Sequence, residues 1–220
     1  METVRLFFEK KGDAKYLAHL DVMRCFTRAI KISKVKAWYT EGFNPHLYLM
    51  FVSPLSLGFE SEYEAVDVRI EGDFDFDELL EKINSALPKG IRVFKADYAK
   101  KSYKEIGYSI WRADIMLSEK SIMDKRSFLE FIDQDVILVN RKNKKGAERK
   151  EDIKPLIKRV CVSEVEGVLS IECTLVTNTS IALNPQLLMD NYKKFVNDNS
   201  ETTIRIRRLK LLDAQGNAFS

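Results

Sequence analysis

The order of hydrophobic patterns along the chain constrains its fold more than any other feature. Residues 3–9 alternate apolar and other side chains, as a half-buried strand does. Residues 16–34 then repeat with the period of a helix, with an apolar side and a charged side. Two strands, a helix and a last strand are expected at residues 47–53, 63–70, 75–87 and 91–98. The first half of the chain therefore predicts the order β-α-β-β-α-β.

The second half of the chain repeats this order. Its elements are expected at residues 108–117, 124–133, 135–140, 168–176, 185–197 and 202–211. Asn184 and Pro185 give the last helix a suitable cap and first residue. Each half is then a ferredoxin-like unit, in which both helices cover one face of an antiparallel four-stranded sheet. We predict an α+β protein of two such domains, residues 1–99 and 108–213, with a basic insertion at 141–159.

The other face of the first sheet has no helix to cover it. By alternation Arg5, Phe7, Asp67 and Arg69 fall on that face, which mixes charge with an aromatic ring. We expect this face to be partly solvated or turned toward a ligand. The fold itself names no function, because many functions share it.

The composition is that of a globular protein. Of the 220 residues, 45% are hydrophobic and 31% are charged, which is enough to bury a core. The opening METVRLFFEK lacks the apolar run of a signal peptide, and no window approaches the ~18 apolar residues of a membrane span. We therefore expect a cytoplasmic protein with no membrane partner. Cys25, Cys161 and Cys173 are too widely spaced for a disulfide framework, a zinc knuckle or an iron-sulfur cluster, so we expect no metal and no other cofactor.

Positive charge is concentrated in one segment. Residues 141–159 carry nine Lys or Arg against three acids, so this segment is +6 while the whole chain is +3. A flexible cationic hairpin or loop suits nucleic-acid binding, which depends on neutralising phosphates and releasing counterions. The RNA-binding candidates in this segment are Arg141, Lys142, Lys144, Lys145, Arg149 and Lys150. The alternative is a solvated surface loop or a docking site for an acidic protein.

The last strand adds to this set of candidates. Arg205 and Arg207 share one side of the strand and extend the basic patch. Arg208 breaks the alternation, and we expect a bulge at that position.

Two further groups of candidates lie in the first half of the chain. Arg24 and Arg28 are one helical turn apart, which suits the binding of phosphates or a carboxylate. A local pair between Asp21 and Arg24 on a solvated face is the alternative. The stretch YTEGFNPHLY contains glycine and proline, so we expect a loop that leaves Asn44 and His46 free to contact a base or sugar. A purely structural connection is the alternative.

Each of the two histidines has a structural and a chemical interpretation. His19 lies on the apolar side of the first helix, the usual place of a neutral core histidine, but near a helix start it can also serve as a general acid or base on RNA. His46 is expected to be more exposed. Because neither has an acidic partner at motif spacing, the two do not predict a metal site. We therefore assign no catalytic residue.

Four segments carry a resemblance to a known family: KYLAHLDVMRCFTRAI, YTEGFNPHLYLMFVSPLSLGFESEYEAVDV, KPLIKRV and ALNPQLL. They resemble the radical-SAM-linked proteins, a bacterial family of unknown function encoded beside, or fused to, radical SAM enzymes and often near ribosome and RNA-processing genes. The matching residues are His19, Leu20, Asp21, Arg24, Arg28, Glu41, Gly42, Phe43, Asn44, Pro45, His46, Gly58, Ser61 and Glu64. Leu47 and Tyr48 depart from the commoner family pattern, which has a proline and a basic residue there.

The tandem layout is also similar to the RNA-processing endonucleases of CRISPR systems. Those proteins carry a glycine-rich loop near the C-terminus. The corresponding stretch here, TTIRIRRLKLLDAQGNAFS, has a single glycine, so the similarity is one of architecture.

These resemblances and residues lead to one functional hypothesis and two alternatives. The hypothesis is an RNA-binding accessory module, without catalytic activity of its own, that presents a tRNA or rRNA to a separately encoded radical SAM enzyme. One alternative is a metal-independent endoribonuclease that uses His19 or His46. The other is a protein scaffold that docks a radical SAM protein without contacting RNA.

Overall fold

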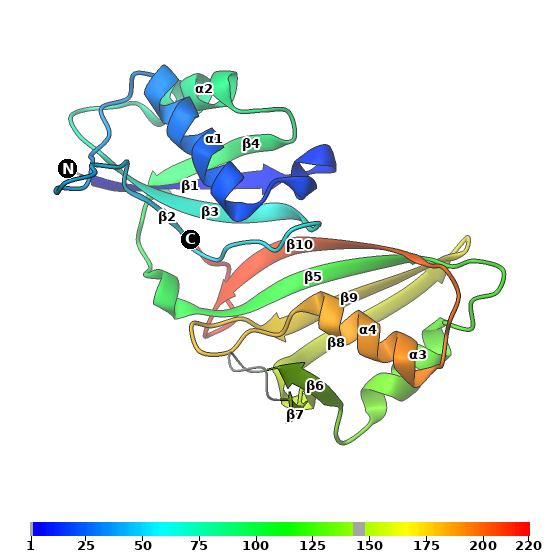
Figure 1. Ribbon diagram of the computed structural model, residues 1–220. Helices are drawn as coiled ribbons and strands as arrows, with labels where there is room; N and C mark the ends of the chain where they lie inside the picture. Colours follow the sequence, from blue (N-terminus) through cyan, green and yellow to red (C-terminus); the bar gives the residue numbers. More distant parts are fainter. Residues whose placement is uncertain (1, 143–147) are drawn as a thin grey trace. The chain divides into compact units, whose positions relative to one another are not determined.

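The computed structural model describes residues 2–142 and 148–220, with the side chains of 141, 142 and 148 excepted. The chain divides into two compact units (Figure 1). Unit 1 consists of Met1–Glu105, Arg208–Leu211 and Ala218–Ser220, and unit 2 consists of Ile106–Arg207 and Leu212–Asn217. Residues of the last strand therefore belong to both units.

Unit 1 has the order β-α-β-β-α-β. Its elements are β1 (Glu2–Lys10), α1 (His19–Ile32), β2 (Leu49–Phe51), β3 (Glu60–Ile70), α2 (Phe76–Ala86) and β4 (Ile91–Tyr98), with short 3-10 turns at Gly12–Tyr16 and Tyr103–Glu105. The sheet is antiparallel, with β1 between β4 and β3 and with β2 paired to β3. Both helices lie on one face of the sheet (Figure 1), which confirms the predicted ferredoxin-like arrangement.

The core of unit 1 lies between this sheet and its two helices. Val22, Phe26 and Ile30 line one side of α1 at helical spacing and are buried against inward-facing residues of β1 and β3. The Asp75 carboxylate caps α2 by accepting hydrogen bonds from the backbone amides of 77 and 78, both at 2.9 Å. The amphipathic period of the sequence therefore predicted both helices.

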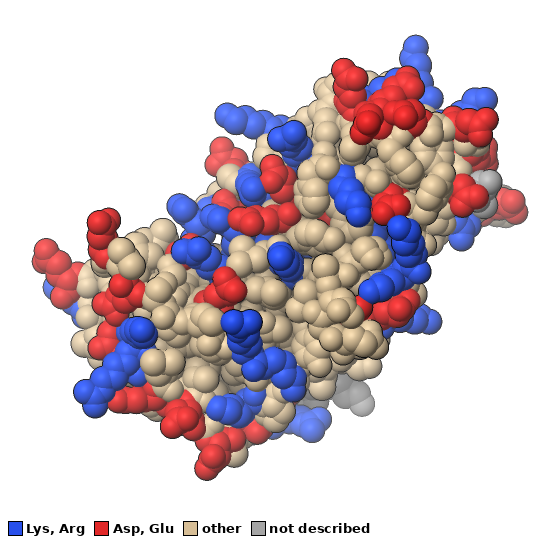
Figure 2. All heavy atoms as spheres, turned by 180° about the vertical axis from the view of Figure 1, so that it is seen from behind, with Lys and Arg blue, Asp and Glu red and all other residues tan. Residues whose placement is uncertain are grey.

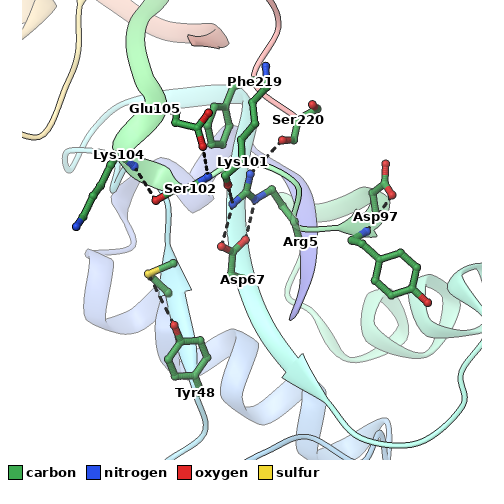
Figure 3. Close-up of polar contacts among 12 residues, drawn as sticks. Arg5, Tyr48, Asp67, Asp97, Lys101, Ser102, Lys104, Glu105, Phe219 and Ser220 are labelled. Carbon is green, nitrogen blue, oxygen red and sulfur yellow. Dashed lines mark hydrogen bonds and ion pairs between the residues drawn. The ribbon is translucent and has the colours of Figure 1, made fainter. Parts of the chain in front are cut away.

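The helix-free face of unit 1 differs from the expectation of a partly solvated surface. Arg5, Phe7 and Asp67 are buried, and the Arg5 guanidinium forms two hydrogen bonds with the Asp67 carboxylate, at 2.7 and 2.9 Å (Figure 3). Arg5 also donates to the backbone carbonyls of Lys101 at 2.8 Å and Ser220 at 3.2 Å. Residues 218–220 and 101 thus cover the centre of this face, which the local strand pattern did not predict.

Unit 2 has the same basic order with an added hairpin. Its elements are β5 (Ile106–Met116), α3 (Lys125–Asp133), β6 (Leu138–Lys142), β7 (Glu148–Asp152), a 3-10 turn (Lys154–Leu156), β8 (Ile157–Val165), β9 (Val168–Val176), α4 (Pro185–Phe195) and β10 (Thr203–Asp213). Strand β9 lies between β5 and β8, and both pairs are antiparallel. Helices α3 and α4 lie on one side of this sheet (Figure 1), and the Phe128 ring of α3 meets the Tyr192 ring of α4 edge-on at 4.8 Å.

One strand of unit 2 was assigned wrongly from the sequence. The strand that pairs with β9 is β8, which begins at Ile157 inside the expected basic insertion, whereas the segment near 135–140 forms β6 of a separate two-stranded hairpin with β7. Strand β8 lies at the edge of its sheet, and most of its side chains are exposed. Its apolar alternation is therefore too weak to stand out among the neighbouring lysines and arginines.

Two glycines of unit 1 provide a matched test of how closely the chain before β4 packs against the end of β1. Gly90 and Gly72 both have positive φ, at +89° and +79°, but a Cβ on Gly90 would lie 2.5 Å from the Lys11 carbonyl oxygen, whereas one on Gly72 meets nothing within 4 Å. We expect Gly72→Ala to cost about 1 kcal/mol through backbone strain. Gly90→Ala should cost roughly 1–3 kcal/mol more because the β4 entry must move away from Lys11. Urea unfolding of both variants measures this difference, and equal losses would contradict the packing described.

Candidate nucleic-acid interface

The arginines expected on the first helix lie on its exposed side. Arg24 and Arg28 of α1 are both exposed. Arg24 donates to the Asp21 carboxylate at 3.0 Å, the local pair that the sequence offered as an alternative. An exposed pair of this kind contributes little to stability, since solvent screens it. The helix therefore displays cations without holding them in a fixed binding geometry.

The stretch expected to be a loop forms a small hairpin, residues 38–48, which we call the motif hairpin. Its two sides meet through an isolated bridge between Tyr39 and Leu47, a hydrogen bond from Thr40 N to His46 O at 2.8 Å, and one from Tyr48 N to Trp38 O at 3.2 Å. Asn44 lies near the tip and is exposed, as expected. The conformation is therefore more ordered than a simple connection between α1 and β2.

The two histidines occupy different environments. The His19 ring is half-buried and meets the Phe51 ring edge-on, with centroids 4.9 Å apart. His46 is exposed, and its Nδ1 lies 2.9 Å from the Thr40 hydroxyl and 3.3 Å from the Asn44 carbonyl oxygen. These contacts are local and structural, and they add no support to the nuclease hypothesis.

The basic segment contributes Arg141 and Lys142 to β6, Glu148–Asp152 to β7 and residues 157–159 to the start of β8. The backbones of Arg141 and Arg149 lie opposite each other in the register of the β6–β7 hairpin, as do those of Asn140 and Lys150. The side chains of Arg149 and Lys150 are exposed. Of the remaining candidates, Lys144 and Lys145 lie outside the described residues, and Arg141 and Lys142 are described only in their backbone.

Not every cation of the segment belongs to the surface. Lys154 turns inward, and its ammonium donates to the backbone carbonyl of Ile132. This contact fastens the turn after β7 to the end of α3. Lys154 therefore stabilises the fold, and counting charges along the sequence overstated the cationic surface.

Several arginines of unit 2 lie on the side of its sheet that no helix covers. Residues 111, 113 and 115 of β5 are buried, so residues 112 and 114 face outward. The register places Arg112 opposite Glu172 of β9, and Glu172 lies opposite Cys161 of β8. We call the outward-facing arginines of β5, β8 and β10 the arginine face: Arg112, Arg159, Arg205 and Arg207. On β5, β8, β9 and the unit 2 part of β10, the outward-facing acids are Asp114 and Glu172, so positive charge is in excess.

A hollow opens within the arginine face. It has a volume of about 340 Å³ and is lined by Arg112, Asp114, Met116, Ser163, Val165, Val168, Ser170 and Arg205. Arg112 donates to Asp114 at 2.9 Å and to the Ser170 hydroxyl at 3.3 Å, so its guanidinium is held in place. The structure thus brings Arg205, which the sequence singled out, together with Arg112, which it missed.

The carboxylate in this hollow is ionised more readily than an ordinary aspartate. Burial alone would raise the pKa of Asp114, but hydrogen bonds from Ser170 and Arg112, with the positive charge of Arg112 and Arg207, lower it overall. Asp114 therefore remains charged and fixes Arg112. Figure 2, seen from the side opposite to that of Figure 1, shows Lys and Arg interspersed with Asp and Glu, so the basic surface is local and not continuous.

Arg208 has a different environment from Arg205 and Arg207 on the same strand. Arg207 is half-exposed, whereas Arg208 belongs to unit 1 and is buried, with Nη1 donating to the Ser53 carbonyl at 2.8 Å and Nε 3.4 Å from the Glu64 carboxylate. Glu64 and Ser61, both residues of the resemblance, are therefore part of a buried polar cluster in unit 1 with Arg208 and Lys10. Burial raises the pKa of Glu64, although Arg208, Ser61 and Lys10 oppose the rise.

The arginines that sequence reasoning missed have only weak signals in the sequence. Arg112 interrupts the apolar run of YSIWRADIML at an outward-facing position, and Arg159 was counted only as one charge of the basic segment. Their proximity depends on the register of β5, β9 and β8, which requires the correct assignment of β8.

Comparison with known proteins identifies the family. A family profile with the description "Uncharacterized protein conserved in bacteria (DUF2344)" matches residues 3–185. The chain belongs to this bacterial family. No protein with a curated description matches the sequence. Membership of this family fits the general resemblance noted in the sequence, and the description says nothing of radical SAM enzymes or of endonucleases.

One solved structure supports the fold of this family member. A chain in the "Crystal Structure of a Cbf5-Nop10-Gar1 Complex" aligns with a TM-score of 0.53 at 9% identity, covering 96% of this chain and 48% of that one. This chain therefore spans about half the length of that structural neighbour, and the similarity concerns the fold alone. A second match, the "Crystal Structure of an Unknown Protein from Galdieria sulphuraria", has a TM-score of 0.27 at 9% identity, with 94% and 98% coverage.

Neither a membrane-spanning helix nor a cluster of metal-ligating side chains occurs in the part of the chain that the structure describes. None of its helices there is long and apolar enough to cross a membrane. Among the same residues, no three His, Cys, Asp or Glu side chains converge in a way that could hold a metal ion.

The Glu64–Arg208 pair leads to a prediction about stability and pH. We expect Arg208→Met to cost about 3–5 kcal/mol at pH 7, because it leaves a buried carboxylate without its cation. The unfolded state releases the Glu64 proton near its ordinary pKa of 4.5, whereas the folded state releases it at higher pH, so stability falls as pH rises above that value. The cost of Arg208→Met should therefore be smaller at pH 4 than at pH 7.

Urea unfolding at the two pH values measures this effect. The double variant Glu64→Gln with Arg208→Met is the control, since it removes both charges and should recover most of the loss. A loss that is independent of pH, or a double variant as unstable as the single one, would contradict the buried pair.

Proposed function

We propose that this protein is an RNA-binding accessory module that presents RNA to a separately encoded radical SAM enzyme. The observation that carries the proposal is the arginine face of unit 2. It places Arg112, Arg159, Arg205 and Arg207 on the uncovered side of a ferredoxin-like sheet, on the same unit as the basic β6–β7 hairpin. The proposed role of the module is to bind the phosphate groups of RNA without catalysing a reaction itself.

The geometry of the arginine face suits single-stranded RNA. Guanidinium groups bind phosphate oxygens through two parallel hydrogen bonds and also stack on bases. A sheet face is open and gently twisted, so an extended strand with unpaired bases has access to it. Arg159 and Arg205 are exposed and make no hydrogen bond or ion pair with other described residues, which leaves their donors for a ligand.

The cysteines support assigning the radical chemistry to a partner. Burial raises the pKa of Cys173 to about 12, so its thiol does not ionise near neutral pH. Burial and the neighbouring Asp21 also raise the pKa of Cys25 on α1. Cys161 lies on β8, opposite Glu172, and faces away from Cys173. Cys161 and Cys173 therefore lie on opposite faces of one sheet and are not arranged to bind a single iron-sulfur cluster together.

A charge-matched pair of variants tests the proposal. The variant Arg159→Gln with Arg205→Gln removes two positive charges from the arginine face, and Arg126→Gln with Lys194→Gln removes two from the exposed surface of α3 and α4. Binding to purified tRNA should weaken at least 10-fold in the first variant and less than 2-fold in the second. The slope of log K against log salt should become shallower by about 1.4 in the first, from ~0.7 per lost phosphate contact with a single strand.

Titrations at several salt concentrations between ~50 and 200 mM measure both quantities. Equal losses in the two variants would show that only total charge matters, and affinity that does not respond to salt would reject phosphate binding altogether. If the radical SAM partner binds through the arginine face in the absence of RNA, the scaffold alternative replaces this proposal.

A further inference from the structure

The motif hairpin holds an arginine against two aromatic rings on unit 1. The guanidinium carbon of Arg69 lies 4.9 Å from the centre of the Trp38 ring and 4.3 Å from that of Tyr48. The two rings also contact each other, with centroids 5.9 Å apart at 61°. Trp38 and Tyr48 lie on opposite sides of the hairpin stem, and Trp38 is fixed by a hydrogen bond from its backbone amide to the Arg69 carbonyl at 2.9 Å.

Arg69 lies on the same face of the sheet as Arg5, but the two arginines make different contacts. Asp67 and Arg69 are two residues apart on β3, and Asp67 lies opposite both Arg5 and Met50 in the register. Figure 3 shows the Arg5 guanidinium hydrogen-bonded to Asp67, Lys101 and Ser220, with Tyr48 away from this cover. The cover therefore closes the centre of the face and leaves the end with Arg69 accessible.

The donor groups of Arg69 are not used within the described part of the protein. No hydrogen bond or ion pair there involves its guanidinium, and its side chain is only half-buried. By contrast, the buried Arg5 and Arg208 both donate to backbone carbonyls. Contact with two aromatic rings restrains the Arg69 guanidinium, which prepares it to bind an anion without a large loss of side-chain entropy.

We propose that Trp38, Tyr48 and Arg69 form a binding site for one nucleotide of single-stranded RNA, with the guanidinium on the phosphate and the aromatic rings against the base or sugar. Guanidinium forks match phosphate oxygens, and aromatic faces accept any base, so the site would bind without strong sequence preference. The inference rests on the proposed function because its ligand is RNA, but it concerns unit 1 and residues that the arginine face does not include. It also gives the motif hairpin a role: the hairpin supplies both rings.

Tryptophan fluorescence provides a direct readout of this site. The chain has two tryptophans, and the other, Trp111, is buried in unit 2. A five-residue oligouridylate should quench the emission of Trp38 with a saturable curve, and Trp38→Phe should remove this quenching. The curve gives an affinity for the site in the full-length protein.

Two substitutions and one control test the role of Arg69. Arg69→Gln should weaken the oligouridylate at least 10-fold, and Arg69→Lys should weaken it about 5-fold, since lysine keeps the charge but lacks the planar fork. Arg92→Gln on the exposed surface of β4 should change the affinity less than 2-fold. Circular dichroism and urea unfolding of each variant separate lost binding from lost folding. Quenching that is unchanged in Arg69→Gln, or weakened equally in Arg92→Gln, would overturn the proposal.

The failures of the two proposals are distinguishable. If Arg159→Gln with Arg205→Gln leaves tRNA binding intact while Arg69→Gln abolishes oligouridylate quenching, the arginine face is wrong and the nucleotide site stands. If tRNA binding requires the arginine face but the oligouridylate quenches Arg69→Gln as strongly as the unchanged protein, only the nucleotide-site proposal fails. A hexaglutamate peptide that competes with the oligouridylate at equal concentration would also overturn the nucleotide assignment, because it would show a general site for acidic chains.

Discussion

Side chains alternate across every β-strand, and this alternation sets the main constraint on the molecule. In each unit two helices bury one face of an antiparallel sheet, so the other face must be covered by something else or remain open to solvent. Unit 1 closes the centre of that face with the buried Arg5–Asp67 pair and residues 218–220. Unit 2 leaves the corresponding face open and lines it with arginines. The proposed functions of the two units follow from this difference.

The buried charges of unit 1 show how such a face is closed. Arg5 and Asp67 satisfy each other through two hydrogen bonds, and the remaining donors of Arg5 reach backbone carbonyls. The Phe219 ring adds a cation–π contact, with the guanidinium carbon 4.7 Å from its centre. A buried ion pair is tolerated only when nearly all its polar atoms are paired, because the loss of hydration is otherwise uncompensated. Arg69 lacks such partners and lies where the cover ends.

Much of the fold was predictable because its strongest signals are local. The apolar sides of α1 and α2 repeat at helical period, and Asp75 and Asn184 cap their helices as their positions indicate. Strand β8 was not predictable, because an exposed edge strand has little apolar alternation and Lys158 and Arg159 concealed it among other charges. The inward direction of the Lys154 side chain was not predictable either, because a count of charges does not tell which way each side chain points.

The candidate sites were less predictable because they depend on contacts between distant segments. The sequence placed Arg205 and Arg207 on one side of a strand, but only the register of β5, β9 and β8 brings Arg112 and Arg159 onto the same face. It likewise placed Arg69 on a helix-free face, but the rings that hold it come from the two sides of the motif hairpin. Residues 218–220 cover Arg5 although they lie more than two hundred positions away, a contact that strand periodicity does not encode.

Ultraviolet crosslinking of the protein to bound RNA, followed by mass spectrometry of the crosslinked peptides, shows which surface of the protein contacts RNA. We expect crosslinks in β5, β8, β9 and the Thr203–Arg207 part of β10, at positions that face outward on the helix-free side of unit 2. Crosslinks confined to α3 and α4, which cover the opposite side of that sheet, would contradict this expectation.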